Sequence, residues 1–553
     1  MYDLVLLHAP SIYDFRKKKL NLGVISDVVP STPIFEMYPI GYVSIVSTLV
    51  KQGYSVRLLN LAVRMLLDKK YDVSKAIKSI DSILYGIDLH WLPSVQGTIN
   101  IAKIIKQYHP NRHLVFGGLS ATYYAKEIMQ KYPYIDFVLK GDTTEPYFSK
   151  LIDTIEKNGD YSKIPNLVWR KESKIIENPF ESPEGHINEV FLDYKTFAKN
   201  SLLNLKIEET IPYKTWLNAP SGMTFIQKGC RYNCIFCGGS AFAYRNFYCR
   251  KHMSLRDPAK ILEEIKLMKE YLGSPIFIAG DVHDAGHKFE DELLQGIKKE
   301  KIDVPILFEI FKPASEDFFK NVSKNINEYA LEISPESSNE NIRAITGKAY
   351  TNSSLESTIS LALKYGAKKM DVFFSIGLPR QDKQAVEHDI NYAKKLKEKF
   401  GTKLYIFSSP LAPFIDPGSL AFEKAKYYGY KLYARTLEEH YAIFNENNSW
   451  NKLFNYETKW LTREDIAIYS LESALNFLNY KVNKELREKL EDQITAFSNN
   501  KEQNINSLIK PVAYKKDELQ WYSKNYAKSL PSIALLIYLK FKSMQIEHKH
   551  KNM

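Results

Sequence analysis

The first 150 residues alternate between short apolar runs and stretches in which apolar residues recur at helical spacing. The apolar runs have the length of buried strands and occupy residues 3–10, 55–61, 82–90, 113–118 and 136–142. The stretches with helical spacing between them are 39–53, 95–110 and 120–133. This regular alternation predicts a doubly wound parallel sheet with helices on both faces.

Parallel sheets of this kind bind ligands at the carboxyl ends of their strands. Gly117 and Gly118 directly follow one predicted strand, and two glycines there would let the backbone approach a ligand closely. A glycine pair that serves only a tight, well-packed turn is an equally good interpretation. The loops that follow the strands are therefore candidates for a binding site, and no single one of them is decisive.

A second series of strands and helices begins near residue 222, after a looser stretch from 151 to 215 that we interpret as a linker. Its predicted strands are 223–229, 275–281, 305–311, 329–337, 368–379 and 403–410. Six strands with helices between them predict a partial or full β/α barrel with its active site at the carboxyl ends of the strands. Helical spacing dominates beyond residue 430. We divide the chain into domains at 1–185, 215–430 and 431–553, the last a helical extension.

The composition of the 553-residue chain fits a folded protein of several domains, since 44% of its residues are hydrophobic and 13% are aromatic. With four cysteines and no secretion leader visible, we expect a cytoplasmic protein. No apolar stretch reaches the roughly 20 residues that a membrane-spanning helix needs. The net charge of +12 suits an anionic partner such as a lipid headgroup surface, or it is ordinary surface charge of a Lys-rich chain.

Three of the four cysteines lie close together after the first predicted barrel strand, in the spacing C-x3-C-x2-C formed by Cys230, Cys234 and Cys237. Thiolates at this spacing can hold a 4Fe-4S cluster and leave one iron without a protein ligand. A zinc site is the alternative. It would need a fourth ligand such as Cys249 or His252, and structural zinc motifs usually contain two pairs of ligands instead of a triplet.

The cysteine triplet, with the aromatic Phe236 before its third member, resembles the radical S-adenosylmethionine (SAM) superfamily. The resemblance implies that the open iron binds SAM, whose reductive cleavage gives a 5′-deoxyadenosyl radical that abstracts hydrogen from unactivated carbon. It also implies an electron donor such as ferredoxin or flavodoxin. The cofactor carries the difficult chemistry in such enzymes, and the protein positions the reactants and excludes water.

Further segments resemble SAM-binding motifs of this superfamily, and they lie at the ends of predicted strands. The residues that the resemblance assigns to SAM are Phe236, Gly280, Asp281, Glu336, Ser337 and Gly377. Gly280 and Asp281 belong to an Ala-Gly-Asp sequence that replaces a Gly-Gly-Glu-like motif, so Asp281 could instead cap the next helix. Glu336 and Ser337 could likewise serve only as the start of the helix that follows them.

The N-terminal sheet resembles the Rossmann-like cobalamin-binding domain of cobalamin-dependent radical SAM enzymes. The resemblance covers about residues 1–430 and implies that cobalamin is bound by Gly117, Gly118, Ser120, Gly141 and Asp142. The sequence departs from the cobalamin motif D-x-H-x-x-G, which is absent after the first strand. Asp88 and His90 follow the third strand, with Pro93 in the place of the glycine, so we do not expect His90 to coordinate cobalt. Binding of cobalamin without a histidine and loss of the corrinoid both stay open.

The substrate is suggested by resemblance alone. Segments 86–97 and 409–440 resemble an archaeal subfamily near the enzymes that form cyclopentane rings in membrane tetraether lipids (GDGT). This implies lipid biosynthesis and a lipid or other small-molecule substrate, with peripheral contact at the inner membrane face through the Lys-rich tail 539–553. A solvated chain end is the plainer interpretation of that tail.

Three alternatives to lipid ring formation stay open. A cobalamin-dependent C-methyltransferase acting on a peptide or small molecule would have a smaller and more polar substrate pocket than a lipid cyclase. A nucleic-acid modifier such as a methylthiotransferase is allowed by the charge. The second three-cysteine cluster usual in methylthiotransferases is absent, so we do not expect a nucleic-acid partner. A zinc-binding interaction protein without catalytic activity is the fourth possibility, and metal analysis would separate it from the enzymes.

Overall fold

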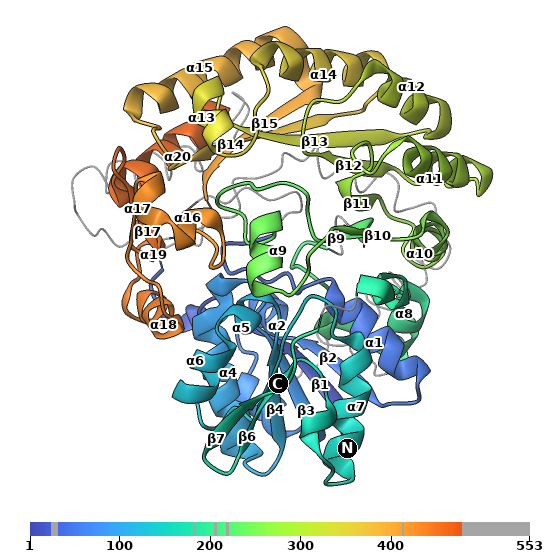
Figure 1. Ribbon diagram of the computed structural model, residues 1–553, viewed down its shortest axis with the longest axis vertical. Helices are drawn as coiled ribbons and strands as arrows, with labels where there is room; N and C mark the ends of the chain where they lie inside the picture. Colours follow the sequence, from blue (N-terminus) through green and yellow to red (C-terminus); the bar gives the residue numbers. More distant parts are fainter. Residues whose placement is uncertain are drawn as a thin grey trace, which may run out of the picture.

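The computed structural model describes residues 1–477 except 21, 24–30, 182–183, 204–206, 217–219 and 412–413. Two parallel sheets dominate the described part of the chain. The N-terminal sheet lies in the lower half of Figure 1, the second sheet arches over the upper half, and the cysteine loop with helix α9 (Ala241–Phe247) lies between them. The α/β class predicted from the alternating apolar pattern is confirmed.

The N-terminal sheet has the strand order β2-β1-β3-β4-β5-β6-β7. Its strands are β1 (Tyr2–His8), β2 (Val56–Asn60), β3 (Ser82–Asp88), β4 (His113–Gly117), β5 (Phe137–Leu139), β6 (Leu167–Lys171) and β7 (Lys174–Glu177). The first five pair in parallel, and the last two add an antiparallel edge. Helices on both faces bury the central strands, which explains their continuous apolar runs.

The helices of this domain are α1 (Gly41–Lys51), α2 (Leu61–Leu67), α3 (Val73–Lys78), α4 (Val95–Tyr108), α5 (Leu119–Tyr123), α6 (Ala125–Lys131) and α7 (Glu145–Glu156). The helix predicted at 120–133 is divided into α5 and α6 at Tyr124. The stretch interpreted as a linker contains α8 (Tyr194–Leu203) and the hairpin of β6 and β7. The hairpin turns where Glu172 adopts a φ of 55°, and the charged residues of these edge strands obscure an apolar pattern.

The second sheet has the order β15-β14-β13-β12-β11-β8, so consecutive strands are neighbours and all pairs are parallel. Its strands are β8 (Gly222–Phe225), β11 (Ile276–Asp281), β12 (Ile306–Ile310), β13 (Tyr329–Glu336), β14 (Met370–Ile376) and β15 (Leu404–Pro410). The outer helices are α10 (Pro258–Tyr271), α11 (His287–Lys299), α12 (Glu316–Asn325), α14 (Asn352–Lys364) and α15 (Lys383–Phe400). β8 and β15 do not pair with each other, which gives a partial barrel.

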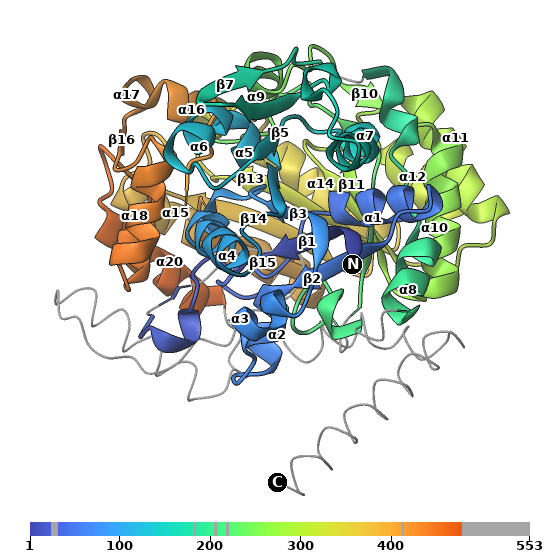
Figure 2. The ribbon, with the colours of Figure 1, turned by 90° about the horizontal axis from the view of Figure 1, so that it is seen from below.

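The described part of the C-terminal region contacts both domains, since α20 packs on β14 and β15 of the second sheet and α18 packs on α4 of the N-terminal domain (Figure 2). It contains α16 (Leu420–Glu423), α17 (Ala425–Tyr428), α18 (Leu437–Glu446), α19 (Trp450–Leu453), α20 (Arg463–Phe477) and the short strands β16 (Tyr430–Leu432) and β17 (Tyr456–Thr458). Tyr124 on the N-terminal domain donates a hydrogen bond to the Arg435 carbonyl at 2.8 Å. None of the helices in the described ranges could cross a membrane. The part of the predicted helical extension beyond residue 477, with the basic tail 539–553, lies outside those ranges.

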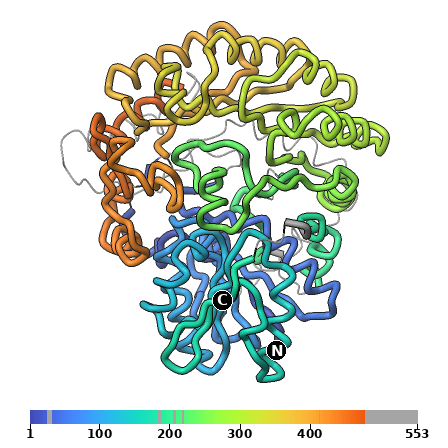
Figure 3. Tube along the Cα trace, in the orientation of Figure 1, coloured from blue at the N-terminus to red at the C-terminus, as the bar shows by residue number. Residues whose placement is uncertain are grey.

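The chain trace shows how the two domains lie on either side of the cysteine loop (Figure 3). The blue N-terminal domain and the yellow barrel strands face each other across the green cysteine loop, and the orange C-terminal helices run along one side of both. The carboxyl ends of the N-terminal strands therefore point toward the first strand of the barrel and its cysteine loop. This places the two predicted ligand-binding edges against each other.

Candidate active site between the two sheets

The cysteine loop connects β9 (Gln227–Lys228) to α9 and is closed by its own backbone. The Cys237 N–H donates to the Cys234 carbonyl at 3.2 Å, and the Ala241 N–H donates to the Tyr232 carbonyl at 2.8 Å. Backbone N–H groups also reach the sulfur atoms, with Tyr232 N 3.4 Å from Cys230 Sγ. Such N–H donors stabilise the negative sulfur ligands of iron–sulfur clusters, so the loop is suited to hold one.

The three thiols influence one another, which indicates that they share one site. Burial raises the pKa of all three, and repulsion between Cys237 and the thiols of Cys234 and Cys230 raises that of Cys237 further. No three His, Cys, Asp or Glu side chains of the described chain are placed to hold a single metal ion. Cys249 instead donates to the Phe180 carbonyl at 3.1 Å.

The turn after α13 (Glu340–Ile345) supports the cysteine loop from the barrel side. Gly347 has a φ of 96°, and a Cβ there would lie 2.8 Å from the Asn233 carbonyl oxygen. The next residue, Lys348, forms an ion pair with Glu336 at 2.6 Å. Burial alone would lower the pKa of Lys348, but the charges of Glu336 and Cys234 raise it above its usual range. A cation is therefore held beside the cluster loop.

Gly280 and Asp281 end β11, as predicted, and the Asp281 side chain is 1% exposed. Its two carboxylate oxygens accept the backbone N–H groups of Asp284 at 3.0 Å and Phe311 at 2.8 Å. Both oxygens thus shape the loop after the strand, and burial raises the pKa of this carboxyl group. The assignment of Asp281 to SAM stays a prediction.

Glu309, which the sequence analysis missed, lies on β12 next to Gly280. Its carboxylate accepts the Gly280 N–H at 2.9 Å, and its charge acts on the Cys230 thiol. Burial raises the pKa of Glu309. No sequence motif marks this residue, because its place beside the cysteines follows from the pairing of β11 with β12.

The remaining predicted SAM residues lie at the carboxyl ends of β13 and β14 and in the cysteine loop. The Ser337 hydroxyl donates to Asp389 on α15 at 2.9 Å and so is engaged outside the barrel interior. Gly377 has a φ of 92°, and its carbonyl accepts the Tyr430 hydroxyl at 3.0 Å. Phe236 is partly buried against the cluster of apolar residues around Ile235. Their roles toward SAM stay predictions.

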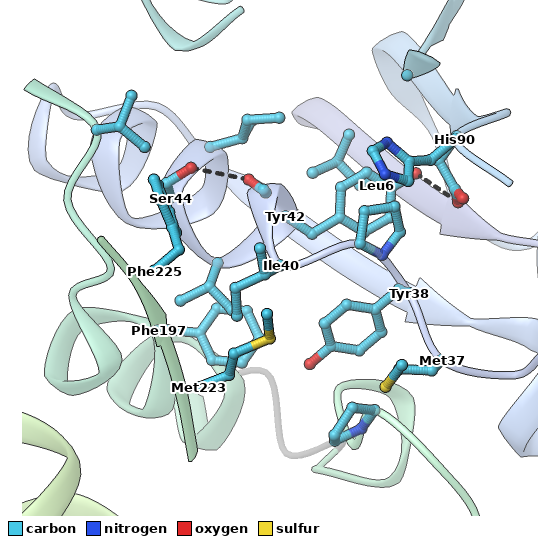
Figure 4. Close-up of a pocket in the computed structure, with 18 of the residues that line it drawn as sticks. Leu6, Met37, Tyr38, Ile40, Tyr42, Ser44, His90, Phe197, Met223 and Phe225 are labelled. Atoms are coloured by element: carbon cyan, nitrogen blue, oxygen red, sulfur yellow. Dashed lines mark hydrogen bonds between the residues drawn. The ribbon is translucent and has the colours of Figure 1, made fainter. Parts of the chain in front are cut away.

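A cavity of about 820 Å³ lies between the N-terminal sheet and the start of the barrel (Figure 4). Four of the five residues predicted to bind cobalamin line it, namely Gly117, Gly118, Gly141 and Asp142. Ser120 is not among the lining residues, and its hydroxyl instead donates to the His90 carbonyl at 3.0 Å. The strand-end loops that the sequence singled out are thus brought to one cavity.

Most of the cavity wall was not predicted from sequence. Figure 4 shows Tyr38, Ile40, Tyr42 and Ser44 on or before α1, and Phe197, Met223 and Phe225 from α8 and β8. Apart from Ser44, these residues are apolar or aromatic and looked like ordinary core positions in the sequence. They are brought together only by the packing of the second domain onto the first.

Two buried carboxylates in the cavity wall each have an oxygen without a hydrogen-bond partner, Asp88 Oδ2 and Glu145 Oε2. The side chains are 4% and 5% exposed. A buried acceptor without a donor is costly, and Glu145 Oε2 indicates a ligand that brings its own N–H or O–H groups. The amide side chains of a corrinoid are such donors, so the wall fits cobalamin.

Polar contacts join the two domains at the rim of the cavity. Lys228, just before the cysteine loop, donates to the Asp142 carbonyl and to the Thr143 hydroxyl, the latter at 3.0 Å. Arg250 forms two hydrogen bonds with the Asp142 carboxylate at 2.6 and 3.0 Å, and both side chains are buried. The predicted cobalamin residue Asp142 therefore also fixes the position of the cysteine loop.

Comparisons with known proteins agree with this arrangement. Residues 27–147 match the B12 binding domain, and residues 224–393 match the Radical SAM superfamily. The chain carries a B12 binding domain followed by a radical SAM domain. The radical SAM domain uses a 4Fe-4S cluster and SAM, and the B12 binding domain takes cobalamin. The predicted enzyme class and these three predicted cofactors are confirmed.

The radical SAM enzyme is similar to several relatives. An uncharacterized methyltransferase of Pyrococcus horikoshii is 25% identical over 59% of this chain and 67% of the relative. The anaerobic magnesium-protoporphyrin IX monomethyl ester cyclase of Synechocystis is 26% identical over 50% of this chain and 51% of the relative. The chain thus spans two thirds of the first relative and about half of the second.

Among solved structures, the radical S-adenosylmethionine methyltransferase TsrM from Kitasatospora setae, with cobalamin and a 4Fe-4S cluster bound, shares the fold. The TM-score is 0.62 over 91% of this chain and 98% of that chain, at 13% identity. The resemblance to enzymes that form rings in tetraether lipids finds no support in these comparisons.

Proposed function

We propose that the protein is a cobalamin-dependent radical SAM methyltransferase that adds a methyl group to a carbon atom of a small molecule or peptide. The observation that carries the proposal is the cavity shared by the two domains, which has the cobalamin-domain loops on one wall and Gln227, Lys228 and Tyr244 on the other. Bound there, cobalamin would supply a methyl carrier next to the radical generator. The methyltransferase relatives support the same reaction class.

Some residues of the chain would hold the cofactors, and others would shield them from water. Cys230, Cys234 and Cys237 would hold the cluster, and Lys348 would balance the negative charge of the sulfur ligands beside it. The apolar wall of the cavity would keep water from the corrinoid. The contacts of Lys228 with Asp142 and Thr143 would keep the two cofactor sites at a fixed separation.

The inner face of the barrel favours a polar substrate over an isoprenoid chain. Glu309, Glu332 and Asp371 are direct partners across β12, β13 and β14. Asp371 already forms a buried ion pair with Lys369 at 2.6 Å. Their neighbours along the strands are apolar residues of the core under the outer helices, so these three carboxylates lie on the inner face. A cyclase for lipid chains would need an apolar tunnel at this place.

The test is an anaerobic assay of the enzyme loaded with cluster and cobalamin, using SAM that carries a trideuterated methyl group. Fractions of polar metabolites, peptides and membrane lipids from the host serve as substrates. We expect a polar compound to gain the labelled methyl group, detected by mass spectrometry, and the Cys234→Ala variant to give no labelled product. Membrane lipids that lose hydrogen and gain rings without label would overturn the proposal.

A further inference from the structure

His90 is the one histidine among the described residues that line the cavity. It follows β3 at the carboxyl edge of the sheet, and Figure 4 shows its ring at the cavity near Leu6 and Tyr42. Trp91 contacts the ring edge-on, with the ring centres 4.4 Å apart. Neither ring nitrogen has a hydrogen bond to a described residue. The imidazole is therefore placed in the cavity without a structural partner for its nitrogen atoms.

The glycine-rich segment after β4 contacts the backbone of the loop that carries His90. Gly118 lies directly against it, since a Cβ on Gly118 would be 2.6 Å from His90 Cα. Ser120 Oγ donates to the His90 carbonyl at 3.0 Å, and Ala121 N donates to the Leu89 carbonyl at 2.9 Å. This segment thus holds the His90 backbone at the cavity, in addition to lining the cavity.

The imidazole ring can supply a metal ligand. Neutral imidazole is the form of histidine that binds metals, through the lone pair of one ring nitrogen. Since neither nitrogen of His90 is bonded to a described residue, that lone pair is open to the cavity.

A carboxylate is present nearby to orient the ring. Asp88 Oδ1 is within 2.8 Å of His8 Nδ1 and accepts the Tyr42 hydroxyl at 3.0 Å, whereas Asp88 Oδ2 is buried and has no partner. Histidines bound to a metal commonly donate their second ring N–H to a carboxylate. Asp88 Oδ2 is an acceptor available for that bond.

We propose that His90 is an axial ligand of the cobalt of bound cobalamin. The D-x-H-x-x-G motif is absent after β1, but β3 is the neighbour of β1 in the sheet, so its loop ends at the same edge. The sequence Asp88-Leu89-His90 brings a carboxylate and an imidazole to that edge from the adjacent strand. The proposal rests on cobalamin binding and is independent of methyl transfer.

The test is electron paramagnetic resonance of the purified full-length protein loaded with cob(II)alamin. Coordination by a ¹⁴N atom splits the cobalt hyperfine lines into three, and ¹⁵N splits them into two. We expect protein labelled with ¹⁵N only in histidine to give two-line splitting, which also excludes the cofactor's own benzimidazole as the ligand. Three-line splitting that labelling leaves unchanged, or no nitrogen splitting, would overturn the proposal.

Variants identify the histidine. His90→Ala should lose the histidine-dependent splitting, and His113→Gln, at the opposite end of β4 in the same sheet, should keep it. If the His90→Ala protein takes up no cobalamin, a second measurement uses cobinamide, which lacks the benzimidazole. Wild-type and His113→Gln proteins loaded with cobinamide should both show nitrogen splitting that follows the histidine label. Nitrogen splitting that persists in a cobalamin-loaded His90→Ala protein would refute the assignment. Absence of nitrogen splitting from the proteins loaded with cobinamide would refute it as well.

Discussion

At the scale of single residues, the same side-chain type takes very different roles according to its surroundings. Cys230, Cys234 and Cys237 act on one another and receive backbone N–H groups, whereas Cys249 is bound to a carbonyl away from them. Asp281 and Glu309 are neighbours across two strands, yet the first holds a loop and the second faces the cysteines. The role of a cysteine or a carboxylate in this site therefore depends on the atoms that it contacts.

Replacement of one cluster cysteine tests the cluster assignment. Cys234→Ala leaves two thiolates, too few to hold a 4Fe-4S cluster, so iron content, cluster absorbance and formation of 5′-deoxyadenosine from SAM should all be lost. The matched control is Cys249→Ala, which should keep the iron and the cleavage of SAM. A Cys234→Ala protein with full iron content and SAM cleavage would refute the assignment.

At the scale of elements, the strands are held by burial and the loops by contacts with distant loops. The cysteine loop depends on the turn at Gly347, on Asp416, which accepts the Gly238 N–H at 2.9 Å, and on the carbonyl of Thr346, which accepts the Ile235 N–H at 3.2 Å. The shape of this loop is thus set by segments more than one hundred residues away.

Two glycines with nearly the same backbone conformation test this dependence. Gly347 and Gly366 have φ values of 96° and 99°, but a Cβ on Gly366 would meet nothing within 4 Å. Gly366→Ala should cost only the backbone strain, about 1–2 kcal/mol. Gly347→Ala adds a clash with Asn233, so we expect a larger fall in the unfolding temperature together with loss of bound iron. Equal effects of the two substitutions would show that the turn does not support the cluster loop.

At the scale of the whole molecule, the two domains act as one because their interface carries buried charge and encloses the cavity. Arg250 and Asp142 are 0% and 6% exposed, so their ion pair is shielded from water. Removal of one partner from such a pair leaves a buried, uncompensated charge. The C-terminal helices add contacts to both domains along one side of the molecule.

Asp142→Asn tests how firmly the domains are joined. It leaves the Arg250 charge buried and should destabilise the protein by roughly 3–5 kcal/mol, with faster proteolysis between the domains and weaker retention of cobalamin. Asp81→Asn is the matched control. It breaks an Arg–Asp pair of the same two-bond geometry whose partners, Arg112 and Asp81, are 37% and 47% exposed. The Asp81→Asn substitution should lower the free energy of unfolding by at most about 1 kcal/mol. Similar losses of stability in both variants would show that the buried ion pair between the domains contributes no more than an exposed pair.

The sequence by itself determined the architecture and the cofactor chemistry. Strands and helices follow from apolar periods that involve residues only a few positions apart, which is why both parallel sheets and all six barrel strands could be predicted. The cysteine triplet is equally local, since three ligands within one loop carry their own spacing. The antiparallel hairpin of β6 and β7 was missed because its charged edge strands lack such a period.

Only the tertiary structure decided which predicted residues meet. Asp281 is engaged by Phe311 and Ser337 by Asp389, and the cavity is built from separate segments of both domains. These contacts join residues 30 to more than 100 positions apart, and no local pattern encodes them. Glu309 and His90 gain their significance in the same way, because strand pairing and the docking of two domains place each beside a cofactor site.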